Sequence, residues 1–352
     1  MEFKPRHQDL IIPQQFEEKS PFYRDIVSST DLTDIIRLSK KEDNNIDYIY
    51  QGNNRSIKID RGNYIVIVPP EFTLDDVVNG TTKFVQEWIL RLYTKTRQRE
   101  ITFDIRDYFA WRKNVTDNQA RRQDFFYSLC TLRDCSYKAF TKKGDFRAIG
   151  TGFISDFKIT GNFVNVELGK YFKEDFLDVT KSIAQYPERL AWLDADKDRI
   201  ALQIARYLYP LASMNYEGKG KPTPYVSITK VLEATDLPTE EELKARRASP
   251  IQKRLEPCLN ALFKLDEEGA EIMYFDLLDP ETKRPLSDKD YYSIVFPPAG
   301  TRANYNLFKK CYLAFQFYEF DTSGAKTKAE RRKRRQEYFK KAAKTKKKAA
   351  KK

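Results

Sequence analysis

The chain has 352 residues, 41% of them hydrophobic and 14% aromatic, which is enough for two domains with buried cores. No apolar run approaches the roughly 18 residues that a membrane span needs, and residues 1–15 lack the apolar segment of a secretory signal. Cys130, Cys135, Cys258 and Cys311 form no CxxC pair, which argues against a zinc site and favours reduced, partly buried thiols. We therefore expect a cytoplasmic protein with no membrane partner.

The net charge of +12 is concentrated at one end of the chain. Residues 325–352 contain 15 Lys and Arg and only 2 Glu, whereas residues 1–324 contain 48 basic and 49 acidic residues. The body is close to neutral, so any DNA-binding surface on it must arise from local placement of charge. The tail, 321–352, is predicted to be a disordered arm that binds DNA without sequence specificity, the alternatives being a membrane-surface segment or a solubilising extension. Its core is Arg331, Arg332, Lys333, Arg334 and Arg335.

Residues 1–72 read as an N-terminal extension with short strands. A short helix is expected at 31–39, followed by strands at 46–50 and 56–60. A buried strand over 63–70 ends at Pro69 and Pro70. No chemistry can be assigned to this extension from its residues.

The pattern over 73–180 predicts a first winged helix-turn-helix domain. Thr73 caps a helix, a β-rich run and a short helix follow, and a third helix spans 118–135. Two turn signals, KKGD and TGN, then divide an extended segment into strand-like pieces. The expected apolar faces of the three helices contain Phe84, Trp88, Ile89 and Leu92; then Ile105, Tyr108 and Phe109; then Phe125, Phe126, Leu129 and Leu132.

The same order of elements recurs over 187–320, which predicts a second winged-helix domain. A helix in 196–215 precedes the strand-like YVSI, the helix TKVLEAT, and a helix that Ser249 and Pro250 open. An extended pair is expected at 271–279 and 290–298, followed by a closing helix over 301–320. The fold class is therefore α+β, with two tandem winged-helix domains.

In a helix-turn-helix the third helix enters the major groove, where Arg and Gln hydrogen-bond to base edges. The wings hold phosphates or enter the minor groove. The candidate DNA-binding residues are Gln119, Arg121, Arg122 and Gln123 with wing residues Lys142, Lys143 and Arg147 in the first domain, and Ser249, Gln252, Lys253 and Arg254 with wing residues Lys283 and Arg284 in the second.

The run IALQIARYLYPLASMN before YVSI, the run SPIQKRLEPCLNALFKL and the run YYSIVFPP resemble motifs of the replication initiator (Rep) proteins of plasmids and related phages. The resemblance covers roughly 75–320 and consists of apolar spacing; the N-terminal segment and the Lys-rich tail depart from it. It implies binding to repeated origin sequences, local duplex opening, recruitment of a host helicase or initiator protein, and a dimer that represses its own promoter.

The sequence argues against an enzyme or a bound cofactor. The one histidine, His7, rules out a nuclease that holds its metal through two histidines. No GxxxxGK[ST] motif is present, and DIRDY and DADKD read as helix caps and exposed faces. Two other functions stay open: a transcriptional regulator with the same two reading heads, and a protein–protein scaffold whose winged helices never touch DNA.

Overall fold

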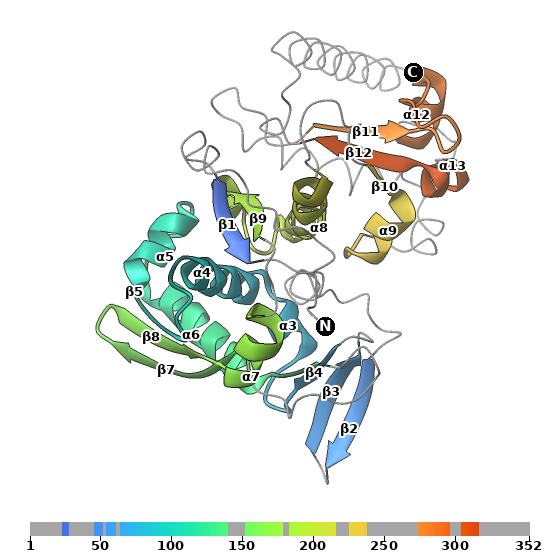
Figure 1. Ribbon diagram of the computed structural model, residues 1–352. Helices are drawn as coiled ribbons and strands as arrows, with labels where there is room; N and C mark the ends of the chain where they lie inside the picture. Colours follow the sequence, from blue (N-terminus) through green and yellow to red (C-terminus); the bar gives the residue numbers. More distant parts are fainter. Residues whose placement is uncertain are drawn as a thin grey trace, which may run out of the picture. The chain divides into compact units, whose positions relative to one another are not determined.

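The computed structural model describes residues 23–27, 46–51, 54–60, 64–139, 152–178, 183–215, 225–237, 274–295 and 304–316. These residues belong to two compact units, unit 1 (Met1–Ser213) and unit 2 (Met214–Lys352). All the strands pair antiparallel, and helices accompany the sheets in each unit, which confirms an α+β fold (Figure 1). Among the described residues, no helix is both long and apolar enough to cross a membrane.

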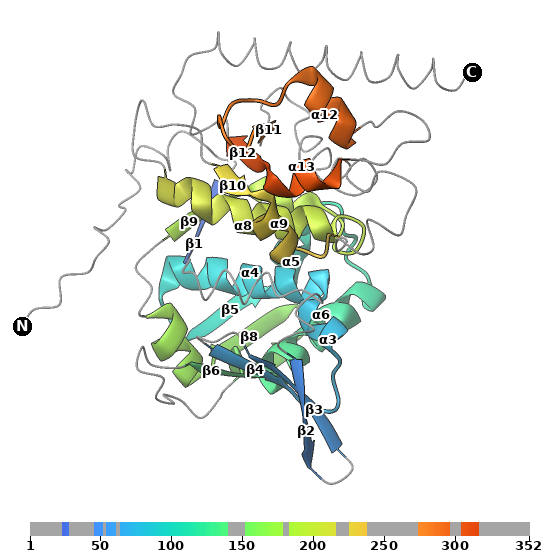
Figure 2. The same ribbon diagram turned by 90° about the vertical axis from the view of Figure 1, so that its right-hand side faces the viewer.

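The N-terminal strands of unit 1 form two separate sheets. The first pairs β1 (Tyr23–Val27) with β9 (Ile183–Pro187). The second has the order β2-β3-β4-β6, and Figures 1 and 2 show its β2–β3 hairpin extending away from the helices of unit 1. Its strands are β2 (Ile46–Gln51), β3 (Asn54–Asp60), β4 (Tyr64–Val68) and β6 (Ser136–Ala139).

The three strands expected in the extension are confirmed, because they coincide with β2, β3 and β4. Strand β4 also pairs with β6, from Tyr64 opposite Ala139 to Ile67 opposite Ser136. The extension is therefore joined to the chain that follows it by a strand ladder. The helix expected at 31–39 lies outside the described residues.

Helices α3 and α4 follow the sheet and begin at well-defined caps. The side chain of Thr73 accepts from the N–H of Asp76, whose carboxylate accepts from the N–H of Thr73, a reciprocal capping box. Asn79 then caps α4 by accepting from the N–H of Thr81. The bounds are α3 (Leu74–Val78) and α4 (Gly80–Thr96).

A three-stranded sheet with two further helices forms the rest of this part of unit 1. The order of its strands is β5-β8-β7, so the last strand in sequence lies in the middle. The elements are β5 (Glu100–Asp104), α5 (Ile105–Arg112), α6 (Gln119–Asp134), β7 (Ile154–Thr160) and β8 (Phe163–Leu168). The expected order of helix, strand, helix, helix and two strands is thus present, with β6, which pairs with β4, between α6 and β7.

Aromatic rings from α4, β5, α5 and α6 fill the core between these elements. The centroid of the Tyr108 ring lies 4.9 Å from that of Phe125, and the centroid of Trp88 lies 5.3 Å from that of Trp111. Buried aromatic side chains of this size contribute about 1.5–3 kcal/mol each through apolar burial, and edge or tilted ring contacts add to it. This core holds α6 against the sheet.

Unit 1 continues through short helical turns into a long helix. These elements are α7 (Lys170–Phe172), a π-helical turn (Lys173–Leu177), a 3₁₀ helix (Glu188–Trp192) and α8 (Arg199–Asn215). Arg206 of α8 forms a bidentate ion pair with Glu87 of α4, at 2.6 and 3.0 Å, and both side chains are buried. The helix expected within 196–215 is therefore confirmed, and its contact with Glu87 lies in unit 1.

Unit 2 contains a second three-stranded sheet, in the order β10-β12-β11. The strand expected at YVSI and the helix that follows it are confirmed as β10 and α9, and the strand expected at 271–279 is confirmed as β11. The bounds are β10 (Tyr225–Ser227), α9 (Ile228–Glu233), β11 (Tyr274–Leu278), α12 (Asp288–Val295), α13 (Tyr305–Lys310) and β12 (Tyr312–Gln316).

The strand expected at 290–298 is wrong, because Asp288–Val295 forms helix α12. The hydroxyl of Ser287 donates to the carboxylate of Asp290 and accepts from its backbone N–H, which is a helix cap. This local capping outweighs the β propensity of the Tyr-Tyr-Ser-Ile-Val run. The Ser-x-x-Asp spacing was present in the sequence.

The closing helix expected over 301–320 is confirmed over Tyr305–Lys310 and is wrong for the described residues beyond it, where Tyr312–Gln316 forms strand β12. Helix α13 ends at Lys310, the N–H of its C-cap residue Cys311 donates to the carbonyl oxygens of Leu307 and Phe308, and β12 follows. Alternating side chains in YLAFQ suit a strand, and Leu313 on one face is fully buried. β12, rather than 290–298, is thus the antiparallel partner of β11.

The described cysteines are free thiols, and two of them are buried. Burial raises the pKa of Cys135 to about 12, and it raises the pKa of the partly exposed Cys130 as well. Because the thiolate is the reactive form, Cys135 should stay unmodified by iodoacetamide at pH 8 in the native protein. Mass spectrometry should show Cys135 reacting only after denaturant is added; rapid labelling of Cys135 before Cys130 in the native state would contradict its burial.

Candidate nucleic-acid interface

The first turn of α6 presents the predicted base-reading residues of unit 1. Asn118 caps the helix by accepting from the N–H of Arg121 at 3.0 Å. The helix begins directly after this cap, and Gln119, Arg121 and Gln123 in its first turns are exposed. These three side chains occupy the surface where the sequence places them.

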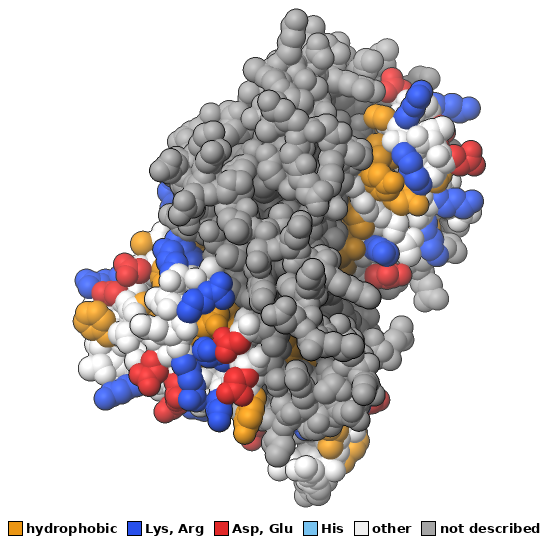
Figure 3. Space-filling view, in the orientation of Figure 1, with side chains coloured by type: hydrophobic (Ala, Val, Ile, Leu, Met, Phe, Trp, Pro, Cys, Tyr) orange, Lys and Arg blue, Asp and Glu red, His pale blue; other side chains and the backbone are white. Residues whose placement is uncertain are grey.

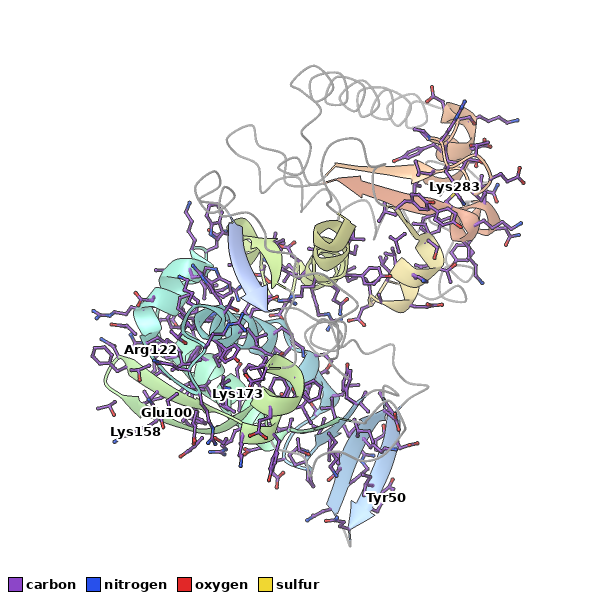
Figure 4. All side chains as sticks on the ribbon, in the orientation of Figure 1. Tyr50, Glu100, Arg122, Lys158, Lys173 and Lys283 are labelled. Atoms are coloured by element: carbon purple, nitrogen blue, oxygen red, sulfur yellow. The ribbon has the colours of Figure 1, made fainter. Side chains whose placement is uncertain are left out.

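Arg122 is engaged within the protein instead of projecting into solvent. Its guanidinium donates to both carboxylate oxygens of Asp117, at 2.6 and 2.7 Å, and its third nitrogen donates to the side-chain oxygen of Asn162 at 2.9 Å. The hydrogen bonds from Arg122 hold the pKa of Asp117 below its ordinary value. Arg122 therefore joins the start of α6 to the turn of the β7–β8 hairpin (Figure 4).

Arg121 has a much weaker internal partner. Its side chain is 54% exposed and makes one ion pair, at 3.1 Å, with Asp124 one turn along the helix. Exposed pairs of this spacing contribute only a few tenths of a kcal/mol, so a base or phosphate can replace Asp124 at little cost. Of the two arginines in the first turn of α6, Arg121 therefore has the guanidinium that is more available to a ligand.

Phe126 lies on the surface, although the sequence pattern placed it in the core. Its side chain is 49% exposed, whereas Phe125 is fully buried. The side chains of Phe125 and Phe126 leave the helix about 100° apart, and only that of Phe125 points into the core. The Phe126 ring lies 5.6 Å from that of Phe157 on β7, and completes an apolar edge beside Gln119 and Gln123.

A shallow hollow of about 450 Å³ lies at this end of α6. Its lining combines amide, guanidinium and carboxylate groups with one exposed ring: Asp117, Asn118, Gln119, Arg122, Gln123 and Phe126. Amide and guanidinium groups match base edges in a major groove, and an exposed phenylalanine matches the thymine methyl group.

The β7–β8 hairpin stands next to this hollow. Its turn is Gly161–Asn162, and Gly161 has φ of +62°, a left-handed conformation that glycine adopts without strain. Phe163, directly after the turn, is 60% exposed, and Lys158 is exposed on the preceding strand. The hydrogen bond from Arg122 to Asn162 therefore places the turn of this hairpin beside the first turn of α6.

Charges of both signs alternate on the described surface of unit 1 (Figure 3). Arg106 pairs with Asp104, Arg121 with Asp124, and Arg122 with Asp117. This agrees with the near-neutral body of the sequence. Non-specific attraction to a phosphate backbone would be weak here, and recognition would depend on directed hydrogen bonds.

Several predicted contacts fall outside the described residues and stay predictions. They are Lys142, Lys143 and Arg147, expected in the wing of the first domain; Ser249, Gln252, Lys253 and Arg254, expected in the third helix of the second domain; and Arg331, Arg332, Lys333, Arg334 and Arg335 of the tail. The strand before Lys142 is β6, which pairs with β4 and not with β7. The described hairpin next to α6 accordingly turns at TGN and not at KKGD.

Lys283 and Arg284 lie in a compact turn of unit 2. The N–H of Asp279 donates to the carbonyl oxygen of Arg284 at 2.8 Å, which closes the turn, and Lys283 has φ of +55°. The Lys283 ammonium lies 3.4 Å from the centroid of the Tyr312 ring, a cation–π contact, while Arg284 is exposed. Within the described part of the chain, no group of three or more His, Cys, Asp or Glu could hold a metal ion.

No protein-family model and no curated protein matches the chain. Solved structures that are similar to it include a selenomethionine form of domains 2 and 3 of RctB and the RctB domains 2–3. Both are 10% identical, and in each case the match covers 65% of this chain and 80% of that one, with TM-scores of 0.38 and 0.37. Likeness at this level carries no argument about function.

Proposed function

We propose that the chain is a sequence-specific double-stranded DNA-binding protein with two winged-helix reading heads. The observation that carries this proposal is an arrangement that occurs in both units. In the sheets β5-β8-β7 and β10-β12-β11, the strand that comes first in the chain lies at one edge, and the strand that comes last in the chain lies in the middle. In each case the first strand leads directly into a short helix, α5 or α9.

The correspondence extends to single hydrogen bonds. The N–H of Ile105, the first residue of α5, donates to the carbonyl oxygen of Asn162 at 2.9 Å. The N–H of Ile228, the first residue of α9, donates to the carbonyl oxygen of Cys311 at 3.0 Å. Asn162 and Cys311 each precede the central strand, and both isoleucines are buried. Two segments without evident sequence identity thus build one motif.

In unit 1 the elements supply what a winged helix requires. Helix α6 follows α5, its exposed first turn lies beside the hairpin β7–β8, and Arg122 fixes the two relative to one another. A helix presented in this way can enter a major groove while its hairpin contacts the neighbouring backbone or minor groove. In unit 2 the equivalent helix would fall within 249–262, outside the described residues.

The finer proposal is a replication initiator. Two reading heads in one chain suit repeated sites, as the resemblance of residues 75–320 to Rep proteins implies. Binding to origin repeats, duplex opening, a homodimer and recruitment of a host helicase or initiator protein all belong to this proposal, as does a cytoplasmic, plasmid- or nucleoid-associated location. A transcriptional regulator would use the same heads on a single palindrome.

Substitutions on α6 test the reading head directly. Arg121→Ala and Gln123→Ala should each cost about 1–3 kcal/mol of binding per lost base contact and relax the preference at one base position. Arg133→Ala is a matched control, because it removes a charge from the other end of the same helix, where Arg133 pairs with Asp134. Affinity and base preference are read by sequencing the fragments that each variant retains from a random duplex pool. Equal behaviour of all three variants would contradict the assignment.

The scaffold alternative has one observation in its favour, the balanced charge of the described unit 1 surface. The scaffold and the proposed DNA-binding protein predict different results when a chain without residues 325–352 is offered duplex DNA. A scaffold would retain no duplex once residues 325–352 are deleted, whereas the proposed DNA-binding protein would still select particular sequences.

A further inference from the structure

The shared motif of the two units identifies which residues of unit 2 take the place of a wing. Ile105 donates to Asn162 and Ile228 donates to Cys311, so Asn162 and Cys311 are equivalent positions. The strand registers agree, since Asp104 lies opposite Phe163 and Ser227 lies opposite Tyr312. Asp104 and Ser227 are also the N-caps of α5 and α9.

The residues before these positions are therefore equivalent too. Thr160 and Gly161 at the tip of the β7–β8 hairpin correspond to Lys309 and Lys310 at the end of α13. In unit 1 this tip reaches the start of α6, because Asn162 accepts from Arg122. By the same geometry the end of α13 lies where the tip of a wing would lie in unit 2.

A hollow of about 680 Å³ lies at the surface beside the end of α13. The described residues that line it include two lysines and three side chains with hydroxyl groups, and none of these described residues carries a carboxylate: Ser227, Thr229, Pro280, Asn306, Lys309, Lys310 and Tyr312. The hydroxyl of Thr229 donates to the carbonyl oxygen of Lys309, which ties the hollow to α9. In Figure 3 the described face of unit 2 shows mainly Lys and Arg among its charged side chains.

We propose that Lys309 and Lys310 form the phosphate-binding surface through which unit 2 holds the DNA backbone, with α13 in the place of a wing. The proposal rests on the proposed DNA-binding function. The ammonium groups and hydroxyl donors among the described lining residues of the hollow suit a phosphate diester. Lys283, by contrast, places its ammonium against Tyr312 in the 279–284 turn.

The test measures how the affinity of the full chain for a duplex of random sequence depends on KCl concentration, by fluorescence anisotropy. Each phosphate contact contributes about 0.9 to the slope of log K against log salt. K309Q/K310Q should lower the steepness by about 2 and weaken binding at about 0.1 M salt on the order of 10- to 100-fold. The matched control is K230Q/K289Q, which replaces two exposed lysines on α9 and α12 and removes the same charge from unit 2.

Four results would overturn the proposal, and they differ in what else they overturn. If K230Q/K289Q has the same effect as K309Q/K310Q, the loss reflects the total charge of unit 2. If K283Q/R284Q lowers the slope and K309Q/K310Q does not, the 279–284 turn is the wing, and the DNA-binding function survives. If the wild-type chain binds no better than a peptide of residues 325–352, unit 2 holds no phosphate backbone, and the proposed function then depends on the selection of particular sequences alone. If a fluorescent nucleoside triphosphate binds in a Lys310-dependent manner while duplex affinity is unchanged, the hollow serves a free phosphate compound.

Discussion

Replacing Arg206 by methionine should lower the free energy of unfolding by about 3–5 kcal/mol. The guanidinium of Arg206 donates to both oxygens of Glu87 at 2.6 and 3.0 Å, with side-chain exposures of 3% and 10%. Removing one partner leaves a buried carboxylate that has lost its bidentate donor, which costs far more than the pair contributes. Chemical denaturation at pH 7 measures the loss.

The double variant Glu87→Gln with Arg206→Met is the control for this prediction. Because it removes both charges, most of the lost stability should return. The Phe84 ring, whose centroid lies 5.1 Å from the Arg206 guanidinium, should pack against the methionine. Equal losses in the single and the double variant would show that the packing of Arg206, and not its charge, holds α8 in unit 1.

Replacing Gly80 by alanine should cost about 2–3 kcal/mol, because a methyl group has no room there. A Cβ at this position would lie 2.2 Å from the carbonyl oxygen of Ala195 and 2.7 Å from its carbonyl carbon. Backbone atoms cannot rotate away as a side chain can, so either the start of α4 or the segment before α8 must move. Thermal unfolding should show a fall in Tm of roughly 5 °C or more.

Gly161→Asn provides the contrast to Gly80→Ala. Gly161 has φ of +62° and nothing within 4 Å of its missing Cβ, so the cost there is conformational and not steric. Asparagine tolerates this conformation better than other residues with a Cβ, and the loss should stay below about 1 kcal/mol. If Gly161→Asn destabilised more than Gly80→Ala, the close approach of Ala195 to α4 would be in doubt.

The sequence predicted elements well where a cap or a clear period marked them. Thr73 and Asn118 begin helices where the pattern placed them, and the three strand-like runs over 46–70 are strands β2, β3 and β4. It failed where two local signals competed, as in 288–295, where the Ser287 cap outweighs the β propensity of a Tyr-rich run. It could not give strand partners, because β4 with β6 and β11 with β12 are long-range pairings.

The candidate site was predictable as a position on α6 but not in its individual roles. Gln119, Arg121 and Gln123 are exposed as expected, whereas Arg122 is held by Asp117 and Asn162. The partner Asn162 lies forty residues away, and such a pairing has no local signal. The equivalence of Lys310 with Gly161 likewise depends on two sheet registers, which residue spacing does not reveal.

The most direct test of the account is selection of DNA by the chain without residues 325–352. Fragments of the source replicon and a random duplex pool are offered at moderate salt, and the retained fragments are sequenced, with Arg121→Ala as the matched variant. The account predicts enrichment of short direct repeats by the wild-type chain and relaxed selection by Arg121→Ala. Retention of no duplex, or of duplexes without any shared sequence, would contradict it.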